Sequence, residues 1–472
     1  MEHLPIQMGW RSLFKRELIP TIVVLLCGVL LQSMNVLMLT TVLPSIVGEL
    51  GGVAMLSWPT TAYLASSIVA ASCAGVLASE VGARPVYCAG VLTFALGALL
   101  CSLAPAMGWV IVGRFIQGFG GGLVVAVAYV LVRGTFPESA WSRTIALMSA
   151  SWSVSVLIGP LVGGLYAHFG NWRSAFVATA AIAVAIAIGA FSILPPVATG
   201  RRSSSLSVPA GRVALICLAI AGTSSTSVLA SPLFKLGGIA AAIISLATML
   251  RLDRQAPNPL LPSDAFSSRT QTGVGLWLAL LLCITFSPLQ IYVPLFLQQL
   301  HGFDPLSAGF AVASASLAWT AASLATAGLP EPWPDRLMLS GPATMGLSLT
   351  AIALLTPHST TLVLVPFIAL LGAGIGQCWP FVAHRIMDSA KEGNETVAAS
   401  SVATVQQMGF ALGAAIAGLI ATASGLSVAI PTDGMIRAAS WVPAGFVVSA
   451  MLAFLTGLRL HHLRKQACNC SD

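Results

Sequence analysis

The chain has 472 residues, of which 57% are hydrophobic and only 8% are charged. Soluble domains carry about 25% charged residues, so this composition excludes a soluble enzyme and predicts an all-α integral membrane protein. The net charge of +7 does not indicate a nucleic-acid partner, because the basic residues lie between the apolar runs, where they mark membrane topology.

Fourteen apolar runs follow one another along the chain. With a window of about 19 residues, the predicted transmembrane helices begin near Ile19, Ser57, Val86, Trp109, Thr144, Ser174, Val213, Leu233, Thr272, Leu306, Leu337, Thr361, Val397 and Met435. Each can cross a hydrocarbon core about 30 Å thick. The weakest run is 213–229, which is short and contains Thr223 to Ser227. If 213–229 and 233–250 both lay on the membrane surface, twelve spans would remain.

The basic residues predict the orientation. Eighteen of the 22 Lys and Arg residues lie in even-numbered loops or the two tails, and only three lie in odd-numbered loops. Because Lys and Arg are retained in the cytoplasm during insertion, we expect both termini to be cytoplasmic. The first apolar run, 19–43, is too long for a cleavable signal, and we expect it to remain as the first span.

Glycines at a constant spacing indicate an internal repeat. A shift of 254 residues aligns Gly118, Gly120 and Gly122 with Gly372, Gly374 and Gly376, and also aligns Gly159 with Gly413 and Gly164 with Gly418. Transporters are commonly built from duplicated bundles. We therefore predict an N-terminal six-helix bundle (1–195), a linker with two extra transmembrane helices (196–271), and a C-terminal six-helix bundle with a cytoplasmic tail (272–472).

Four stretches resemble motifs of the major facilitator superfamily, and within it the fourteen-span drug:proton antiporters. Residues 114–122 match R-x-x-Q-G-x-G in the fourth span, and residues 75–85 resemble the loop after the second span. The fifth span carries a motif similar to that of the antiporter branches, and residues 35–44 and 58–63 resemble the first span and the start of the second. The resemblance implies that these motifs serve gating and helix packing through Gly75, Gly82, Arg84, Gly159, Pro160, Gly163 and Gly164.

Departures from the family pattern concern charge. The acidic residue of the loop motif is Ser79 here, its first Arg is Ala83, and the first-span Asp is Asn35. None of the fifteen acidic residues lies well inside a predicted span, whereas a proton-coupled carrier usually needs a buried carboxylate or His. The chain thus lacks the usual proton-coupling group.

Arg114 is the one basic residue inside a predicted span. Placing a guanidinium there costs about 2.5 to 3.5 kcal/mol on insertion scales, so it needs partners. Gln117, one turn along the same helix, and Asn35 are the expected ones. With Gln32 they form the predicted coupling or cavity site, and further polar and aromatic candidates for the substrate cavity are Tyr63, Trp152, Gln290, Tyr292, Trp319, Gln377 and Trp379.

These features predict a secondary transporter rather than an enzyme, since no nucleophile–His–acid cluster, phosphate loop or metal-ligand spacing is present in the sequence. We expect it to work without a cofactor, as a monomer, in the cytoplasmic (inner) membrane of a bacterium. Its substrate should be a small organic solute, largely neutral or weakly anionic, moved by alternating access as in multidrug efflux. The alternative is an uptake carrier for a planar vitamin-like compound such as riboflavin.

Overall fold

The computed structural model describes residues 10–13, 15–51, 55, 58–168, 171–195, 210–228, 232–256, 259–303, 305–357, 361–426 and 433–469. The regular secondary structure in these ranges is helical. Its elements are α1 (Trp10–Leu13), α2 (Ile19–Leu50), α3 (Trp58–Val81), α4 (Ala83–Ser102), α5 (Met107–Thr135), α6 (Glu138–His168), α7 (Trp172–Ile193), α8 (Ala210–Val228), α9 (Pro232–Arg254), α10 (Gln271–His301), α11 (Pro305–Thr326), α12 (Trp333–Leu355), α13 (Thr361–Asp388), α14 (Glu395–Ala423) and α15 (Asp433–Asn469).

Thirteen of these helices are long and apolar enough to cross a membrane. They are α2 to α7 and α9 to α15. Large apolar side chains on them are exposed, for example Ile188 and Phe191 of α7, each 65% exposed. Such surfaces are stable only against lipid or another apolar partner. The chain is therefore a multi-pass membrane protein. Helix α8 is not among the thirteen candidate spans found in the described residues.

The helices form two compact units. Unit 1 comprises 1–210, 256–262 and 391–404, and unit 2 comprises 211–255, 263–390 and 405–472. Helix α14 is thus divided between the units, while α8 and α9 group with unit 2. The predicted boundary at 195–196 falls at the start of 196–209, outside the described residues.

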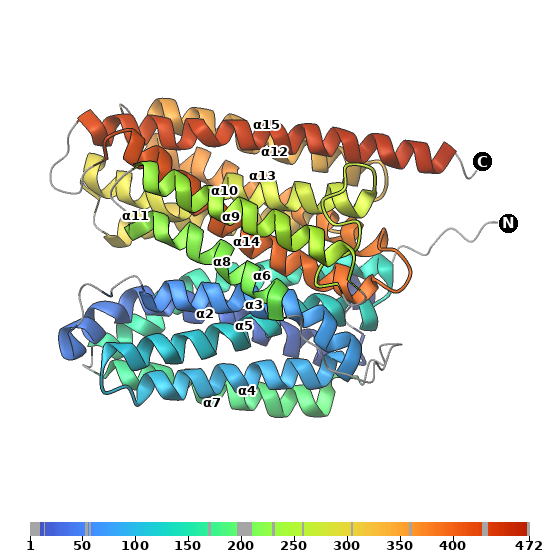
Figure 1. The fold of residues 1–472 in the computed structure, drawn as a ribbon, viewed down its shortest axis with the longest axis horizontal. Helices are drawn as coiled ribbons and strands as arrows, with labels where there is room; N and C mark the ends of the chain where they lie inside the picture. The colour runs from blue at the N-terminus through green and yellow to red at the C-terminus, as the bar shows by residue number, and fades with distance from the viewer. Residues whose placement is uncertain are drawn as a thin grey trace. The chain divides into compact units, whose positions relative to one another are not determined.

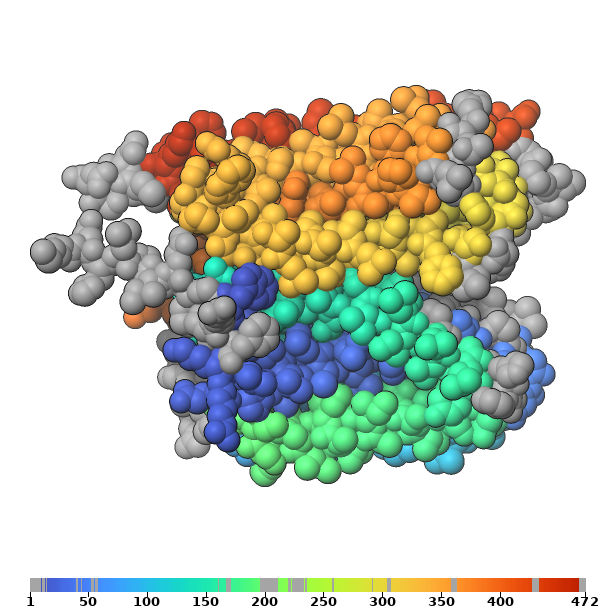
Figure 2. Space-filling model, turned by 180° about the vertical axis from the view of Figure 1, so that it is seen from behind, coloured from blue at the N-terminus to red at the C-terminus, as the bar shows by residue number. Residues whose placement is uncertain are grey.

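In unit 1, α5 packs against both α3 and α4, while α4 also packs against α7. Helix α2 packs against α6 and α7. Figure 1 shows α4 and α7 running side by side, and Figure 2 shows α2 (dark blue), α6 (teal) and α7 (green) on one face of this unit. Because α5 has neighbours on two sides, it carries glycines at the positions where a side chain would collide with α3 or α4.

Unit 2 repeats this arrangement. Helix α13 packs against α11 and α12, and α12 packs against α15, matching the α3–α5, α4–α5 and α4–α7 pairs of unit 1. The aligned glycines make equivalent contacts. A Cβ on Gly122 would lie 2.2 Å from the carbonyl oxygen of Ser67 in α3, and a Cβ on Gly376 would lie 2.3 Å from that of Trp319 in α11. The predicted all-α fold with two repeated helix bundles is confirmed.

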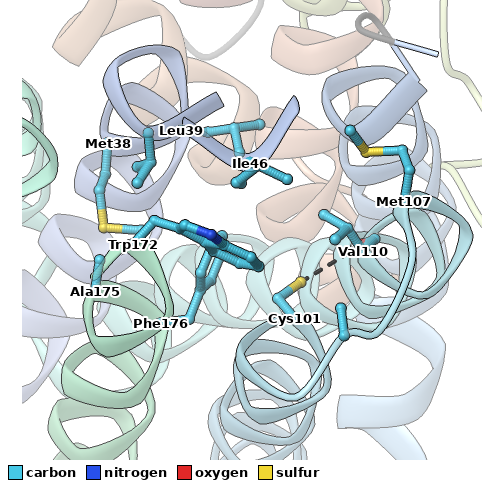
Figure 3. Close-up of a cluster of buried hydrophobic side chains, with 11 residues drawn as sticks. Met38, Leu39, Ile46, Cys101, Met107, Val110, Trp172, Ala175 and Phe176 are labelled. Atoms are coloured by element: carbon cyan, nitrogen blue, oxygen red, sulfur yellow. Dashed lines mark hydrogen bonds between the residues drawn. The ribbon is translucent and has the colours of Figure 1, made fainter. Parts of the chain in front are cut away.

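One end of unit 1 is closed by a hydrophobic cluster that joins α2, α4, α5 and α7. Trp172 and Phe176 at the start of α7 lie at its centre, with ring centroids 6.1 Å apart in an edge-to-face arrangement. Met38 and Ile46 of α2 and Cys101 of α4 pack around them (Figure 3). Close packing of these side chains against one another fixes the ends of these four helices.

A polar clamp lies beside this cluster. Glu49, in the last turn of α2 and beyond the candidate span Ile19–Leu39, accepts hydrogen bonds from Trp172 Nε1 at 2.6 Å and Arg173 Nη1 at 2.5 Å. Arg173 Nη2 also donates to the carbonyl oxygen of Ala104 at 2.8 Å. The hydrogen bonds from Trp172 and then Arg173 lower the pKa of Glu49, because they stabilise its charged form.

The lowered pKa predicts a pH-dependent contribution to stability. A carboxyl with a depressed folded-state pKa stabilises the fold above its unfolded pKa of about 4.3 and loses this effect as pH falls through the folded value. We expect the melting temperature of purified Glu49→Gln to lie slightly below that of the wild type at pH 7. The gap should close between about pH 5 and pH 3. A gap that stays constant over this range would contradict the clamp.

A network of charges joins three helices of unit 2. Asp335, only 8% exposed at the start of α12, lies 2.8 Å from Arg464 Nη1 and 3.1 Å from His461 Nδ1, both of α15. Arg385 of α13 lies 3.6 Å from the same carboxylate. Glu331 approaches Arg464 to 2.6 Å. Because a buried carboxylate is stable only with compensating charges, Asp335 requires these neighbours and holds the ends of α12, α13 and α15 together.

Candidate functional site

Arg114 is buried inside unit 1 with the two partners that the sequence predicts. It lies in α5, about 10 Å from the first residue of the helix, and is 1% exposed. Its Nη1 donates hydrogen bonds to Gln117 Oε1 at 2.6 Å and to Asn35 Oδ1 of α2. Asn35 and Gln117 are both 0% exposed. The two amide side chains are thus joined through a single nitrogen of the guanidinium.

The aromatic ring of Tyr63 covers this guanidinium. The Cζ atom of Arg114 lies 4.1 Å from the ring centroid of Tyr63 in α3, a distance at which the π-face attracts a cation. Gln32 of α2 completes the group, because a Cβ on Gly121 would lie 2.7 Å from the Tyr63 hydroxyl and 3.1 Å from Gln32 Cγ. We call Arg114, Asn35, Gln117, Tyr63 and Gln32 the Arg114 cluster.

The Arg114 cluster presents hydrogen-bond donors that have no acceptor. Asn35 Nδ2, Gln117 Nε2 and Arg114 Nε are buried without a hydrogen-bond partner among the described residues. Leaving a buried donor unpaired costs about 1 to 3 kcal/mol, and more beside a charge. Native structures tolerate such groups chiefly at sites that a ligand or water fills, so the Arg114 cluster is a candidate binding site.

Glycines of α5 allow the helices around the cluster to approach closely. A Cβ on Gly118 would lie 2.1 Å from the carbonyl oxygen of Tyr63, and a Cβ on Gly120 would lie 2.4 Å from the backbone nitrogen of Phe94 in α4. No side chain fits at such distances, so glycine is required. The contact of Gly118 with the Tyr63 backbone holds the Tyr63 ring over Arg114.

The predicted site residues of unit 2 form a separate aromatic cluster. Trp379 is buried, and its ring centroid lies 6.2 Å from that of half-buried Trp319. The ring of Phe286 meets Trp319 edge to face at 5.2 Å and lies 6.4 Å from the ring of Phe410. Phe286 and Phe410 are not among the residues predicted from the sequence. Phe286 lies one helical turn before Gln290, and Phe410 lies three residues before Gly413. Because residues at this spacing share a helix face, Gln290 and Gly413 could have indicated the positions of the two rings.

The other candidates of unit 2 lie outside this aromatic cluster in the described contacts. Gln377 is half-buried and donates from Nε2 to Ser340 Oγ at 3.2 Å. Tyr292 is half-buried, with its ring 6.1 Å from that of Phe296, and Gln290 is exposed. Trp152 of unit 1 is half-buried in α6. A role in substrate binding for these four residues stays a prediction.

The residues of the loop motif predicted to serve gating and packing occupy three kinds of environment. In the loop motif, Gly82 has a φ of +95° and precedes α4, which explains the glycine. The Cζ atom of Arg84 lies 4.4 Å from the ring centroid of Phe191 in α7. A Cβ on Gly75 would lie 2.9 Å from Val397 Cα, within unit 1. The loop motif of this chain therefore rests on close packing and a cation–π contact.

The glycine motif of α6 packs against α2. A Cβ on Gly159 would lie 2.9 Å from the carbonyl oxygen of Met34, and a Cβ on Gly163 would lie 2.7 Å from that of Met38. A Cβ on Gly164 would meet nothing within 4 Å. Pro160 continues α6, but its side chain lies outside the described part of the chain. Close approach of α6 to α2 therefore depends on Gly159 and Gly163.

Comparison with known proteins places this geometry in a family. The family model described as Major Facilitator Superfamily matches residues 25–414. A probable multidrug-efflux transporter of Mycobacterium tuberculosis is 34% identical over 461 residues, covering 94% of this chain and 96% of the relative. The multidrug transporter protein MdtP of Bacillus subtilis is 26% identical over 81% of this chain and 71% of its own length.

The fold is also shared with a solved structure. The human organic anion transporter MFSD10 superposes with a TM-score of 0.71, covering 94% of this chain and 100% of that chain at 16% identity. At such low identity the likeness concerns the fold alone. Taken with the full-length sequence match, it establishes the family and, with it, a non-enzymatic membrane transporter. This chain belongs to the Major Facilitator Superfamily.

Proposed function

We propose that the chain is a secondary transporter that exports small organic solutes, largely neutral or weakly anionic, across the cytoplasmic membrane of a bacterium. The two six-helix bundles would expose a central site to each side in turn, with both termini in the cytoplasm. The protein would act as a monomer, without a cofactor or nucleic-acid partner. The observation that carries this proposal is the buried Arg114 cluster in a chain whose relatives include multidrug-efflux transporters.

Burial of the Arg114 cluster supports a transport role because placing a charge inside a span is costly. An ionisable residue there marks a substrate or ion pathway by default. The unpaired donors of Asn35 and Gln117 add to this cost. The largely neutral substrate follows from the described buried residues of unit 1, which include no Asp or Glu to balance an organic cation.

Efflux from intact cells tests the function. The chain would be expressed in a bacterium deprived of its main drug pumps and loaded with Nile red, which is neutral, or fluorescein, which is weakly acidic. We expect at least one of the two dyes to leave faster than from cells with an empty vector. Unchanged retention of both dyes, with the protein confirmed in the membrane, would overturn the efflux proposal.

A second strain separates export from the vitamin-uptake alternative. Expression in a riboflavin auxotroph at limiting riboflavin should not restore growth if the chain exports drug-like compounds. Growth rescue together with uptake of labelled riboflavin would favour the alternative.

A further inference from the structure

The orientation of two amides leaves the N–H donors beside Arg114 without acceptors. Arg114 Nη1 is hydrogen-bonded to the amide oxygens of both Asn35 and Gln117. An amide whose oxygen faces the guanidinium must direct its NH2 group elsewhere. Both NH2 groups and Arg114 Nε are buried and have no acceptor among the described residues. Asn35 and Gln117 therefore use their amide oxygens on Arg114 and leave N–H donors for another group. The amide oxygen of Gln32 is a buried acceptor without a hydrogen-bond partner among the described residues.

The charge of the cluster is also uncompensated. A guanidinium stays protonated in proteins, so Arg114 brings one positive charge into the interior of unit 1. The buried residues described for this unit include no Asp or Glu. Glu80 is the acidic residue of α3, and it lies 17 positions from Tyr63, about 26 Å along the helix. A cation so placed favours a ligand that supplies the missing negative charge.

The charge and the aromatic surroundings of the cluster indicate the chemistry of that ligand. The Tyr63 ring covers the guanidinium, and Phe94 lies 3.5 Å from the position of a Cβ on Gly121. One positive charge balances a monoanion, whereas a phosphate would bring more negative charge than the described cluster can neutralise. A carboxylate offers two planar acceptor oxygens, which suit a guanidinium and a neighbouring amide.

We propose that the Arg114 cluster binds the ionised carboxylate of an organic solute, with Arg114 and the NH2 groups of Asn35 and Gln117 as donors. This inference rests on the proposed transport function and narrows its substrate class to organic weak acids whose apolar body lies against Tyr63 and Phe94. In such a carrier the substrate itself provides the counter-charge of Arg114. A site of this kind rejects the neutral amide of the same acid, because an amide brings no charge to balance the guanidinium.

Ligand stabilisation of the purified full chain tests the proposal. Benzoate and benzamide have the same ring and nearly the same shape but differ in charge. We expect benzoate to raise the melting temperature of the protein in a concentration-dependent way, since a ligand that binds the folded state stabilises it by mass action. Benzamide should raise it far less. Equal effects of benzoate and benzamide would overturn the proposal.

Two variants and one control assign the effect to the cluster. In Arg114→Gln the benzoate affinity should fall about 10- to 100-fold, as for loss of a charge-assisted hydrogen bond. Asn35→Leu, which keeps the charge, should weaken benzoate binding less and serves if Arg114→Gln does not fold. Arg173→Gln removes an arginine of the same unit that is 33% exposed, and should bind benzoate like the wild type. Unchanged benzoate affinity in both cluster variants would overturn the assignment.

A comparison of two buffers distinguishes binding of an organic carboxylate from binding of an inorganic anion. Titrations are run in chloride and in sulfate at equal ionic strength, and the benzoate response should be present in both. If chloride alone stabilises the protein and benzoate adds nothing, the site takes an inorganic anion and the carboxylate proposal fails. Benzoate binding is measured on purified protein and dye efflux in cells, so the two proposals can fail separately. If benzoate does not stabilise the protein but dye efflux is intact, the proposed substrate class is refuted. If dye efflux is absent, the transport proposal is refuted.

Discussion

Replacing Arg114 with alanine is expected to abolish solute efflux while leaving the protein in the membrane. The variant removes the only charge of the Arg114 cluster and frees the oxygens of Asn35 and Gln117, which Arg114 Nη1 holds. Without this cation, the amides lose the orientation that aims their NH2 groups at a ligand. Dye efflux, normalised to the amount of protein in the membrane fraction, measures the effect.

The same substitution should change the stability of the protein much less than its transport. Burying an unbalanced charge is costly, so removing it offsets part of the packing lost beside the Tyr63 ring. We expect the melting temperature of Arg114→Ala to stay close to that of the wild type. Arg114→Lys keeps a charge, but its ammonium lacks the flat guanidinium that lies against the Tyr63 ring and the further donors beside Nη1, so it should retain only a small part of the efflux. Efflux at the wild-type rate in Arg114→Ala would show that Arg114 is structural.

The sequence was sufficient to predict the repeated helical fold because membrane insertion restricts the possible structures. Spans must be apolar and helical, and close helix contacts in lipid require small residues. The shift that aligns Gly122 with Gly376 therefore carried structural information, which the equivalent contacts with Ser67 and Trp319 confirm. The exception is the segment 213–229, where five hydroxyl residues weaken the apolar signal, and α8 is not among the thirteen candidate spans of the described residues.

The partners of Arg114 were also predictable, since a buried cation needs polar groups and few were available. Gln117 is fixed by helix periodicity, and Asn35 is the amide residue of the first-span motif. The orientation of the two amides was not predictable, because it depends on three-dimensional hydrogen bonding through Arg114 Nη1. The aromatic contacts of Phe286 and Phe410 were missed for a different reason, because apolar residues do not stand out in an apolar span.

The positions of single glycines within a motif were the least predictable feature. Gly163 and Gly164 are adjacent, yet a Cβ on Gly163 would lie 2.7 Å from a backbone oxygen of α2 and a Cβ on Gly164 would meet nothing within 4 Å. Adjacent residues of a helix point about 100° apart, so one of the pair faces the neighbouring helix and the other does not. The sequence contains the pair but does not indicate which member makes the contact.

This difference provides a matched test of helix packing, in which Gly122→Ala is expected to be strongly destabilising and Gly164→Ala nearly neutral. A Cβ on Gly122 would lie 2.2 Å from the carbonyl oxygen of Ser67, a backbone atom that can move only with α3. Overpacking of this kind costs about 1 to 3 kcal/mol, and occasionally more.

Gly376→Ala should behave like Gly122→Ala, because its Cβ would lie 2.3 Å from the carbonyl oxygen of Trp319. Thermal stability of the three purified variants, together with their abundance in the membrane fraction, measures the effect. If Gly122→Ala and Gly376→Ala matched Gly164→Ala in both measurements, the close approach of α5 to α3 and of α13 to α11 would not be a requirement of the fold. If Gly122→Ala and Gly376→Ala were both less stable and less abundant while Gly164→Ala was not, the same helix contact would be needed once in each unit. The two repeats would then be equivalent in energy as well as in sequence.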